Sequence, residues 1–148
     1  MKTLYLDVCT FCRPFDDQQQ LRIRLETDAI YLILRHIEKG FYQAAVSLVH
    51  MKEVAAIRAR GERLEIEALL RRIGIAKPHS DISKVKGRAE ALYTAGFGVA
   101  DAAHAAFAEQ IADYFITCDD KLLKLCKRIN LDVAVCSPVE FVTNEELK

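Results

Sequence analysis

The sequence predicts an α/β protein in which helices cover both faces of a mainly parallel sheet. Short apolar runs of strand length alternate with longer segments whose apolar residues recur at helical spacing. The few glycines and prolines stand between these segments. Such alternation is typical of parallel sheets, because each crossover between strands returns through a helix. No repeat or linker divides the 148 residues, so residues 1–148 are expected to form one domain.

Two strands and three helices are expected in the first half of the chain. In order, they are a strand at residues 4–6, a loop at 13–17, a helix at 21–37 ended by Gly40, a strand at 42–48, a short helix through Glu53 that stops near Gly61, and a helix at 66–73 ended by Gly74. The long helix has the clearest face, made by Leu21, Leu25, Ala29, Ile33 and Ile37. Its solvated side is expected to hold the pairs Arg22–Glu26 and Arg24–Asp28.

The second half is expected to alternate in the same way. Its elements are a helix at residues 82–93 ended near Gly96, an alanine-rich helix from Asp101 to about Ala112, a strand at 114–117, a helix at 120–128 and a last strand at 131–136. These elements complete a sheet with helices on both sides.

The charge of the chain is zero in sum but uneven along its length. Lys and Arg number 21, as do Asp and Glu, which excludes a protein that coats nucleic acid by net charge alone. Residues 89–120 carry six acidic side chains and no Lys or Arg, whereas residues 52–88 carry ten basic and five acidic ones. An acidic block that nothing local neutralises favours a cation site.

The sequence argues against a membrane or secreted protein. The longest stretch without a charged residue, residues 40–51, has 12 residues, whereas a spanning helix needs about 20. Asp7 comes too early for a secretory apolar segment, and an odd number of cysteines, five, indicates the reducing cytoplasm. Cys9 and Cys12 have the spacing of a redox or zinc pair, but the loop expected after them and the lack of a second pair favour ordinary thiols.

Carboxylates are expected to gather at one edge of the sheet, at or near the carboxyl ends of strands. They are Asp7, Glu53, Asp101, Asp119 and Asp120. Ligands of parallel sheets bind at that edge, where the strand order reverses. A hard cation, Mg²⁺ or Mn²⁺, would relieve the repulsion among such acids. The alternative for each acid alone is structural, with Asp101 and Asp119 as helix caps and Glu53 as a solvated helix residue.

Four segments, in this order and spacing, resemble the PIN-domain family over nearly the whole chain. They are Leu4-Tyr-Leu-Asp7, Ser47-Leu-Val-His-Met-Lys-Glu53, Val99-Ala-Asp101-Ala-Ala-His104 and Phe115-Ile-Thr117-Cys-Asp119. Its best-known bacterial members are the VapC-type toxins of toxin–antitoxin pairs. The resemblance implies a three-layer α/β/α fold and a Mg²⁺-dependent endoribonuclease, usually a homodimer, that acts on RNA and, if it is a toxin, binds an antitoxin.

The resemblance also implies roles for single residues. Asp7, Asp101 and Asp119 would bind the metal, and Glu53 would join them directly or through water. Thr117, two positions before the last acid, would orient ligands or water.

The chain departs from the family pattern at two places. Val8 stands where Thr or Ser usually follows the first Asp, so that Thr10 is the nearest hydroxyl. Cys118 stands where the family often has a small or polar residue, and an additional acid, Asp120, follows Asp119. Thr10 and Asp120 are therefore expected to support the site.

Basic residues beside the acids are candidates for RNA phosphate contacts. Lys121 and Lys124 could bind phosphates or simply balance the acids and a helix end. Arg13 could do the same, although holding its own loop through Asp16 or Asp17 is favoured. For His104, one turn after Asp101, a core or supporting role is favoured over general acid catalysis.

The main alternative function is a PIN fold that binds RNA or a protein without cutting, which Val8 favours. A phosphatase or phospho-receiver centred on Asp7 fits less well, because Val8 and Cys9 stand where those proteins need acids. With no net positive charge, RNA binding is expected to be weak and sensitive to salt.

Overall fold

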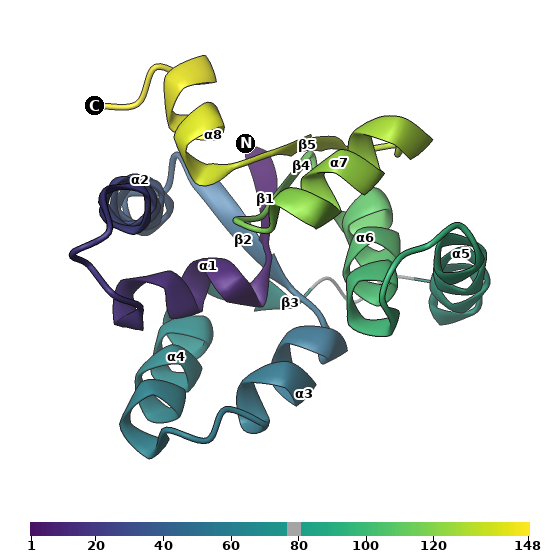
Figure 1. Cartoon of the computed structure of the whole chain (residues 1–148), viewed down its shortest axis with the longest axis horizontal. Coiled ribbons are helices and arrows are strands. Elements are labelled where there is room, and N and C mark those ends of the chain that lie inside the picture. Colours follow the sequence, from purple (N-terminus) through teal and green to yellow (C-terminus); the bar gives the residue numbers. More distant parts are fainter. Residues whose placement is uncertain (77–80) are drawn as a thin grey trace.

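The computed structural model describes residues 1–76 and 81–148, which form a sheet between two layers of helices (Figure 1). The strands are β1 (Lys2–Leu6), β2 (Tyr42–Val46), β3 (Gly74–Ala76), β4 (Tyr114–Ile116) and β5 (Ala134–Cys136). The helices are α1 (Val8–Cys12), α2 (Leu21–Glu38), α3 (Leu48–Ala55), α4 (Arg60–Ile73), α5 (Ile82–Thr94), α6 (Val99–Ile111), α7 (Asp120–Ile129) and α8 (Pro138–Asn144), and a 3-10 turn, η1 (Arg13–Phe15), extends α1.

The five strands run parallel in the order β3-β2-β1-β4-β5. From β1 the chain adds β2 and then β3 on one side. It then crosses to the other side of β1, where it adds β4 and β5. The order therefore reverses between β1 and β4, where Leu6 pairs with Ile116. This confirms the predicted parallel α/β sheet and puts the ligand crevice of such folds beyond the ends of β1 and β4.

Alternate residues of β1 belong to two separate cores, because successive side chains of a strand point to opposite faces. Leu4 and Leu6 pack with residues of α2, α4 and α8, whereas Tyr5 packs with residues of α5, α6 and α7. Figure 1 shows α2 and α4 on one side of the sheet and α5 and α6 on the other. The architecture is the predicted three-layer α/β/α fold.

Helix α6 comes close to the sheet because its inner face is made of small residues. The buried ones are Ala102, Ala105, Ala106 and Ala108. The same helix carries Asp101 in its first turn and the fully buried His104 one turn later. Asp101 was expected to open this helix, but Gly98 holds the N-cap position and Asp101 lies within the first turn.

Four short elements were not predicted from the sequence. The chain turns into α1 directly after Asp7, and Arg13 to Phe15 form η1, so Cys9 and Cys12 lie on a helix and not beside a loop. The three-residue β3 pairs with β2, and α8 begins with a capping box between Ser137 and Glu140. The predicted stop near Gly61 was also wrong, because α3 ends at Ala55 and Gly61 belongs to α4.

Helix α2 is confirmed, but the first two residues of its predicted apolar face do not reach the core. Leu21 and Leu25 are exposed and border a hollow between α2, α7 and α8. Glu26, expected on the solvated side, is buried and pairs with Arg22 at 3.3 Å and Arg13 at 3.6 Å. Among the described residues, no ion pair joins Arg24 and Asp28.

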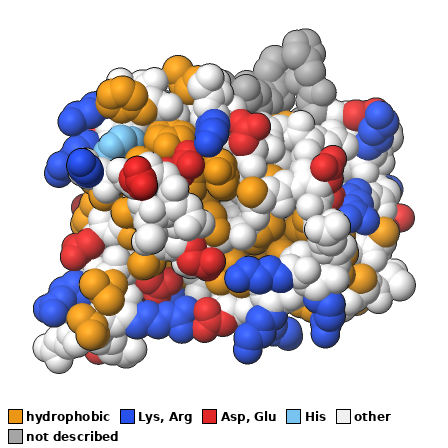
Figure 2. Space-filling model, turned by 90° about the horizontal axis from the view of Figure 1, so that it is seen from above, with side chains coloured by type: hydrophobic (Ala, Val, Ile, Leu, Met, Phe, Trp, Pro, Cys, Tyr) orange, Lys and Arg blue, Asp and Glu red, His pale blue; other side chains and the backbone are white. Residues whose placement is uncertain are grey.

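The surface is mixed in charge. On the face shown in Figure 2, basic and acidic side chains alternate with apolar ones, and neither sign forms a continuous patch. None of the helices within residues 1–76 and 81–148 has both the length and the apolar character that crossing a membrane requires.

Candidate functional site

The candidate site begins where β1 and β4 end side by side. Asp7, directly after β1, is buried, and its Oδ2 accepts a hydrogen bond of 2.7 Å from the hydroxyl of Thr117, directly after β4. The Thr117 hydroxyl in turn accepts from the backbone N–H of Asp119 at 3.1 Å. Thr117 therefore links the first and last acids of the predicted set.

Helix α3 brings Glu53 to the same place. The Ser47 side chain caps the start of α3, which fixes the direction in which the helix leaves β2. One turn and a half later the Glu53 carboxylate contacts Nε2 of His104, and this hydrogen bond lowers the pKa of Glu53. Nε2 of His104 also lies 3.8 Å from Oδ1 of Asp7. Ligand atoms of Asp7, Glu53 and His104 all fall within 4.8 Å of one another.

Asp101 and Asp119 complete the cluster from the other side. Burial, together with the negative charges of Asp7, Asp119 and Glu53, raises the pKa of Asp101 to about 6. Asp119 caps α7, with one carboxylate oxygen accepting from the N–H groups of Lys121 at 2.9 Å and Leu122 at 3.2 Å. Asp101 thus lies within electrostatic reach of the other three predicted acids, while the catalytic role of all four stays a prediction.

The donor set fits a hard divalent cation. Asp7 and Asp119 each have one oxygen held by protein donors, which leaves Oδ1 of Asp7 and Oδ2 of Asp119 without a hydrogen bond from the described residues. Anchored carboxylates with one free oxygen are what an oxygen-ligated ion needs, because outer hydrogen bonds hold its ligands in place. A cation among them would also remove the repulsion that raises the pKa of Asp101.

Two residues expected to support the site do not touch the acid side chains. The Thr10 hydroxyl donates to the main-chain oxygen of Asp7 at 2.7 Å, so it stabilises the start of α1 and does not replace a hydroxyl at position 8. Asp120 is exposed, and Arg22 binds both of its oxygens at 2.7 Å. The supporting roles of Thr10 and Asp120 stay predictions without a contact to the acid side chains, because the first turn of each helix directs these two side chains elsewhere.

The three candidate RNA-binding residues differ in whether another side chain of the protein already pairs with them. Lys121 and Lys124 are exposed on α7, and neither forms an ion pair with another described residue. Arg13 is held by Asp16 at 3.0 Å and faces the buried Glu26, so it stabilises η1, as the favoured alternative had it. Lys121 and Lys124 are therefore the better placed candidates, and the contacts of Arg13 favour its structural role.

Two cysteines lie beside the acids. Sγ of Cys9 is 3.3 Å from Oδ2 of Asp7 and 3.4 Å from the Thr117 hydroxyl, and the backbone N–H of Cys118 points to it at 3.4 Å. All five cysteines are free thiols. The interpretation of Cys9 and Cys12 as ordinary thiols agrees with this, although Cys9 helps to line the site.

Sequence reasoning missed Tyr5. It placed this residue in a strand, yet the phenol hydroxyl lies 2.6 Å from Nδ1 of His104, behind the acids. No sequence pattern distinguishes a core tyrosine from one whose hydroxyl reaches a functional group. The position of Tyr5 two residues before the first acid, and therefore on the opposite side of the strand from Leu6, was the available hint.

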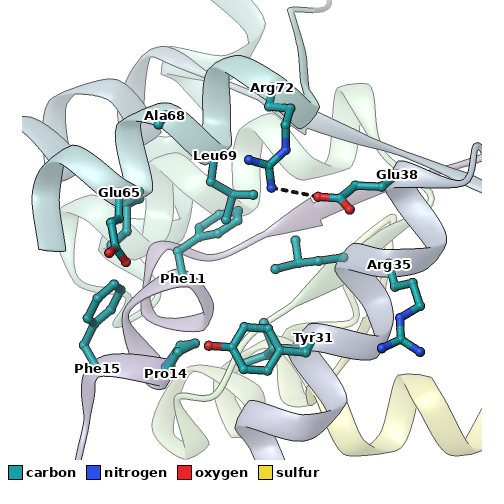
Figure 3. Close-up of a pocket in the computed structure, with 13 residues that line it drawn as sticks. Phe11, Pro14, Phe15, Tyr31, Arg35, Glu38, Glu65, Ala68, Leu69 and Arg72 are labelled. Atoms are coloured by element: carbon teal, nitrogen blue, oxygen red, sulfur yellow. Dashed lines mark hydrogen bonds and ion pairs between the residues drawn. The ribbon is translucent and has the colours of Figure 1, made fainter.

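A second concave surface lies away from the acids. A groove of about 690 Å³ runs between α2, α4 and η1, and Figure 3 shows Phe11 and Leu69 at its floor with Phe15 and Tyr31 along one edge. An ion pair of 2.7 Å between Arg72 and Glu38 closes one end. Phe15 and Tyr31 are both exposed, so the groove offers aromatic contact area to another molecule.

Comparison with known proteins supports the fold. No family model and no curated protein sequence matches this chain. Among solved structures, FitAcB from Neisseria gonorrhoeae superposes with a TM-score of 0.50 over 91% of this chain and 97% of that chain, at 19% sequence identity. At that identity the likeness shows the fold alone, and the fold is PIN-like.

Proposed function

We propose that this protein is a metal-dependent endoribonuclease that hydrolyses RNA phosphodiester bonds. The observation that carries the proposal is the group of Asp7 and Glu53 beside His104 at the reversal point of the sheet, together with Asp101, whose pKa is raised by burial and by the charges of Asp7, Asp119 and Glu53. The PIN-like fold and the motifs that resemble PIN-domain nucleases support the same reaction.

In this mechanism the protein supplies rigid, negatively charged ligands. Bound Mg²⁺ or Mn²⁺ would coordinate phosphate oxygens and make water acidic enough to attack at neutral pH. Asp7, Asp101 and Asp119 would hold the ion, and Thr117 keeps Asp7 in the orientation that binding needs. Lys121 and Lys124 would contact phosphates on either side of the scissile bond.

Cleavage of single-stranded RNA by the purified protein with Mg²⁺ tests the proposal. We expect Asp7→Asn to abolish cleavage, because it removes a charged ligand from the centre of the cluster. Asp28→Asn is the matched control, since Asp28 is exposed on α2. Cleavage that persists in excess EDTA would contradict the metal mechanism. Metal binding without any cleavage would instead favour the module that binds without cutting.

We extend the proposal to a toxin of a type II pair that works as a homodimer and is neutralised by an antitoxin protein. The resemblance to VapC-type toxins motivates it, and the aromatic groove of Figure 3 is the surface that we assign to the antitoxin. Expression of the chain should arrest growth, and Asp7→Asn should not. The product of the adjacent upstream reading frame should relieve the arrest. Tyr31→Asp in the groove should weaken the binding of that product to this protein. A chain that leaves growth unchanged is not a toxin.

A further inference from the structure

No backbone N–H group of the described residues donates to the Glu53 carboxylate. Its side chain is about one third exposed, and the only hydrogen bond to it from the described residues comes from His104. In contrast, the Thr117 hydroxyl at the end of β4 donates to Asp7, and two backbone N–H groups at the start of α7 donate to Asp119. The position of the Glu53 carboxylate therefore depends on the His104 ring.

The His104 ring is held in turn from inside the core. It is fully buried, and its Nδ1 lies 2.6 Å from the hydroxyl of Tyr5, which is also fully buried. The Tyr5 hydroxyl lies 2.7 Å from Oγ of Ser47, the capping residue of α3. A continuous chain of hydrogen bonds thus runs from Ser47 through Tyr5 and His104 to Glu53.

The contacts of His50 determine in which direction the hydrogen bonds of this chain are donated. Nδ1 of His50 accepts from the backbone N–H of Ser47 at 3.0 Å, so its proton is on Nε2, which donates to the Leu6 carbonyl at 2.6 Å. Burial lowers the pKa of His50 to about 4, which keeps this ring neutral.

The Ser47 hydroxyl then has a single good acceptor for its proton. It already accepts from the backbone N–H of Val49 at 3.2 Å, and its nearest acceptor is the Tyr5 oxygen. Tyr5 therefore donates to Nδ1 of His104, which leaves the His104 proton on Nε2, where it faces Glu53.

We propose that the buried chain Ser47–Tyr5–His104 positions Glu53 as a metal ligand, with His104 donating its Nε2–H to the carboxylate instead of binding the ion itself. This inference rests on the proposed metal-dependent function. His104 and Tyr5 are positioning residues, because they act through Glu53. Oε1 of Glu53 is taken by the ring, and Oε2 is left for the ion.

The proton position can be measured without any metal. In ¹⁵N-labelled protein with EDTA, the two ring nitrogens of His104 have distinct shifts for each tautomer, and His104→Gln assigns the signals. We expect the Nε2–H tautomer in the wild type and loss of that preference in Tyr5→Phe. A ring with its proton on Nδ1 alone overturns the proposal, since its Nε2 would then be a ligand for the ion.

Metal affinity tests the positioning role. In calorimetric titrations with Mn²⁺ and Mg²⁺, we expect Tyr5→Phe to weaken binding by about tenfold or more, as loss of outer partners does. In the Glu53→Gln background the same change should alter affinity by less than about twofold, because residues that act through one another are not additive. Tyr42→Phe is the matched control: it removes a tyrosine–carboxylate hydrogen bond, to Glu145, remote from the acids.

The possible failures are distinguishable. If the wild type binds neither ion, the proposed function fails and this inference fails with it. If the wild type binds and Tyr5→Phe binds equally well, the proposed function stands and only the positioning role is wrong. Equal effects of Tyr5→Phe in the wild-type and Glu53→Gln backgrounds would also refute it, since Tyr5 would then act on the protein as a whole.

Discussion

At the scale of single residues, the site depends on acids that the fold holds in an unfavourable arrangement. Asp101 shows this most clearly, because burial and the neighbouring carboxylates raise its pKa to about 6. The folded chain then binds this proton more tightly than the unfolded chain does. Between the ordinary pKa of 3.8 and about 6, stability therefore falls as pH rises, and the full penalty remains above pH 6.

Asp101→Asn should consequently stabilise the protein when no metal is present. Because Asp101 is half-exposed, water screens part of the effect, and we expect a gain of about 1 kcal/mol at pH 7.5 in EDTA and almost none at pH 4. Thermal unfolding at the two pH values measures it, with Asp28→Asn as the exposed control. A loss of stability at pH 7.5 would show that Asp101 is not repelled by its neighbours.

The positions of the acids could be predicted from the sequence, but the contacts of their neighbours could not. Asp7, Asp101 and Asp119 follow or precede apolar segments, and parallel strands bring such positions to one edge. Thr10 and Asp120 are near the acids in sequence, yet the first turns of α1 and α7 direct them to the backbone and to Arg22. Side-chain direction at a helix start depends on backbone geometry that a pattern of residue types does not contain.

At the scale of elements, Gly74 does more than end a helix. A Cβ atom there would lie 2.4 Å from Cγ2 of Val46 and 2.5 Å from the Leu70 carbonyl oxygen, so only glycine lets β3 pair closely with β2 beneath α4. The sequence predicted the stop at Gly74 but not the strand after it. Three residues are too few for an alternation of polar and apolar side chains to be visible.

We expect Gly74→Ala to destabilise the protein by about 2 kcal/mol, because the neighbouring backbone has to shift. Gly61 near the start of α4, the helix that ends just before Gly74, provides a control, since its Cβ position has nothing within 4 Å. Gly61→Ala should stabilise the protein by about 0.5–1 kcal/mol through helix propensity. Urea denaturation of both variants measures the difference, and similar values for the two would contradict the close approach at Gly74.

The exposed face of α7 leads to a prediction about RNA binding, because it carries Lys121 and Lys124 close to the acids. If both lysines contact RNA phosphates, the double change to Ala should weaken RNA binding and reduce the dependence of log K on log salt by about 1.4. Lys127→Ala is the control, since Lys127 lies 3.8 Å from Glu140 and is already paired. Filter binding in a salt series gives both slopes, and an unchanged slope would exclude the phosphate contacts.

At the scale of the whole molecule, the exposed apolar surface is the feature that bears on the predicted homodimer. Leu48, Ile82, Tyr93 and Val99 are large, exposed apolar side chains that line one surface hollow between α3, α5 and α6. The resemblance to dimeric nucleases implies that a second copy covers such a surface.

We therefore expect a dimer in light scattering coupled to size-exclusion chromatography, and a monomer for Val99→Lys. An exposed lysine at position 99 puts a charge into the apolar surface without touching the core. Lys124→Glu, a charge change on α7, is the control and should leave the dimer intact. A wild-type monomer at micromolar concentration would contradict the homodimer.

The central place of β1 has a consequence for the cell that makes this protein. The first acid of the candidate site is Asp7 and the last is Asp119. The strands that precede them, β1 and β4, pair directly in the sheet. A growing chain on the ribosome holds Asp7 for most of its synthesis without the partners that would make it active. A ribonuclease of the proposed kind would need both Asp7 and Asp119, so it would not cut RNA until nearly all of the chain had emerged from the ribosome.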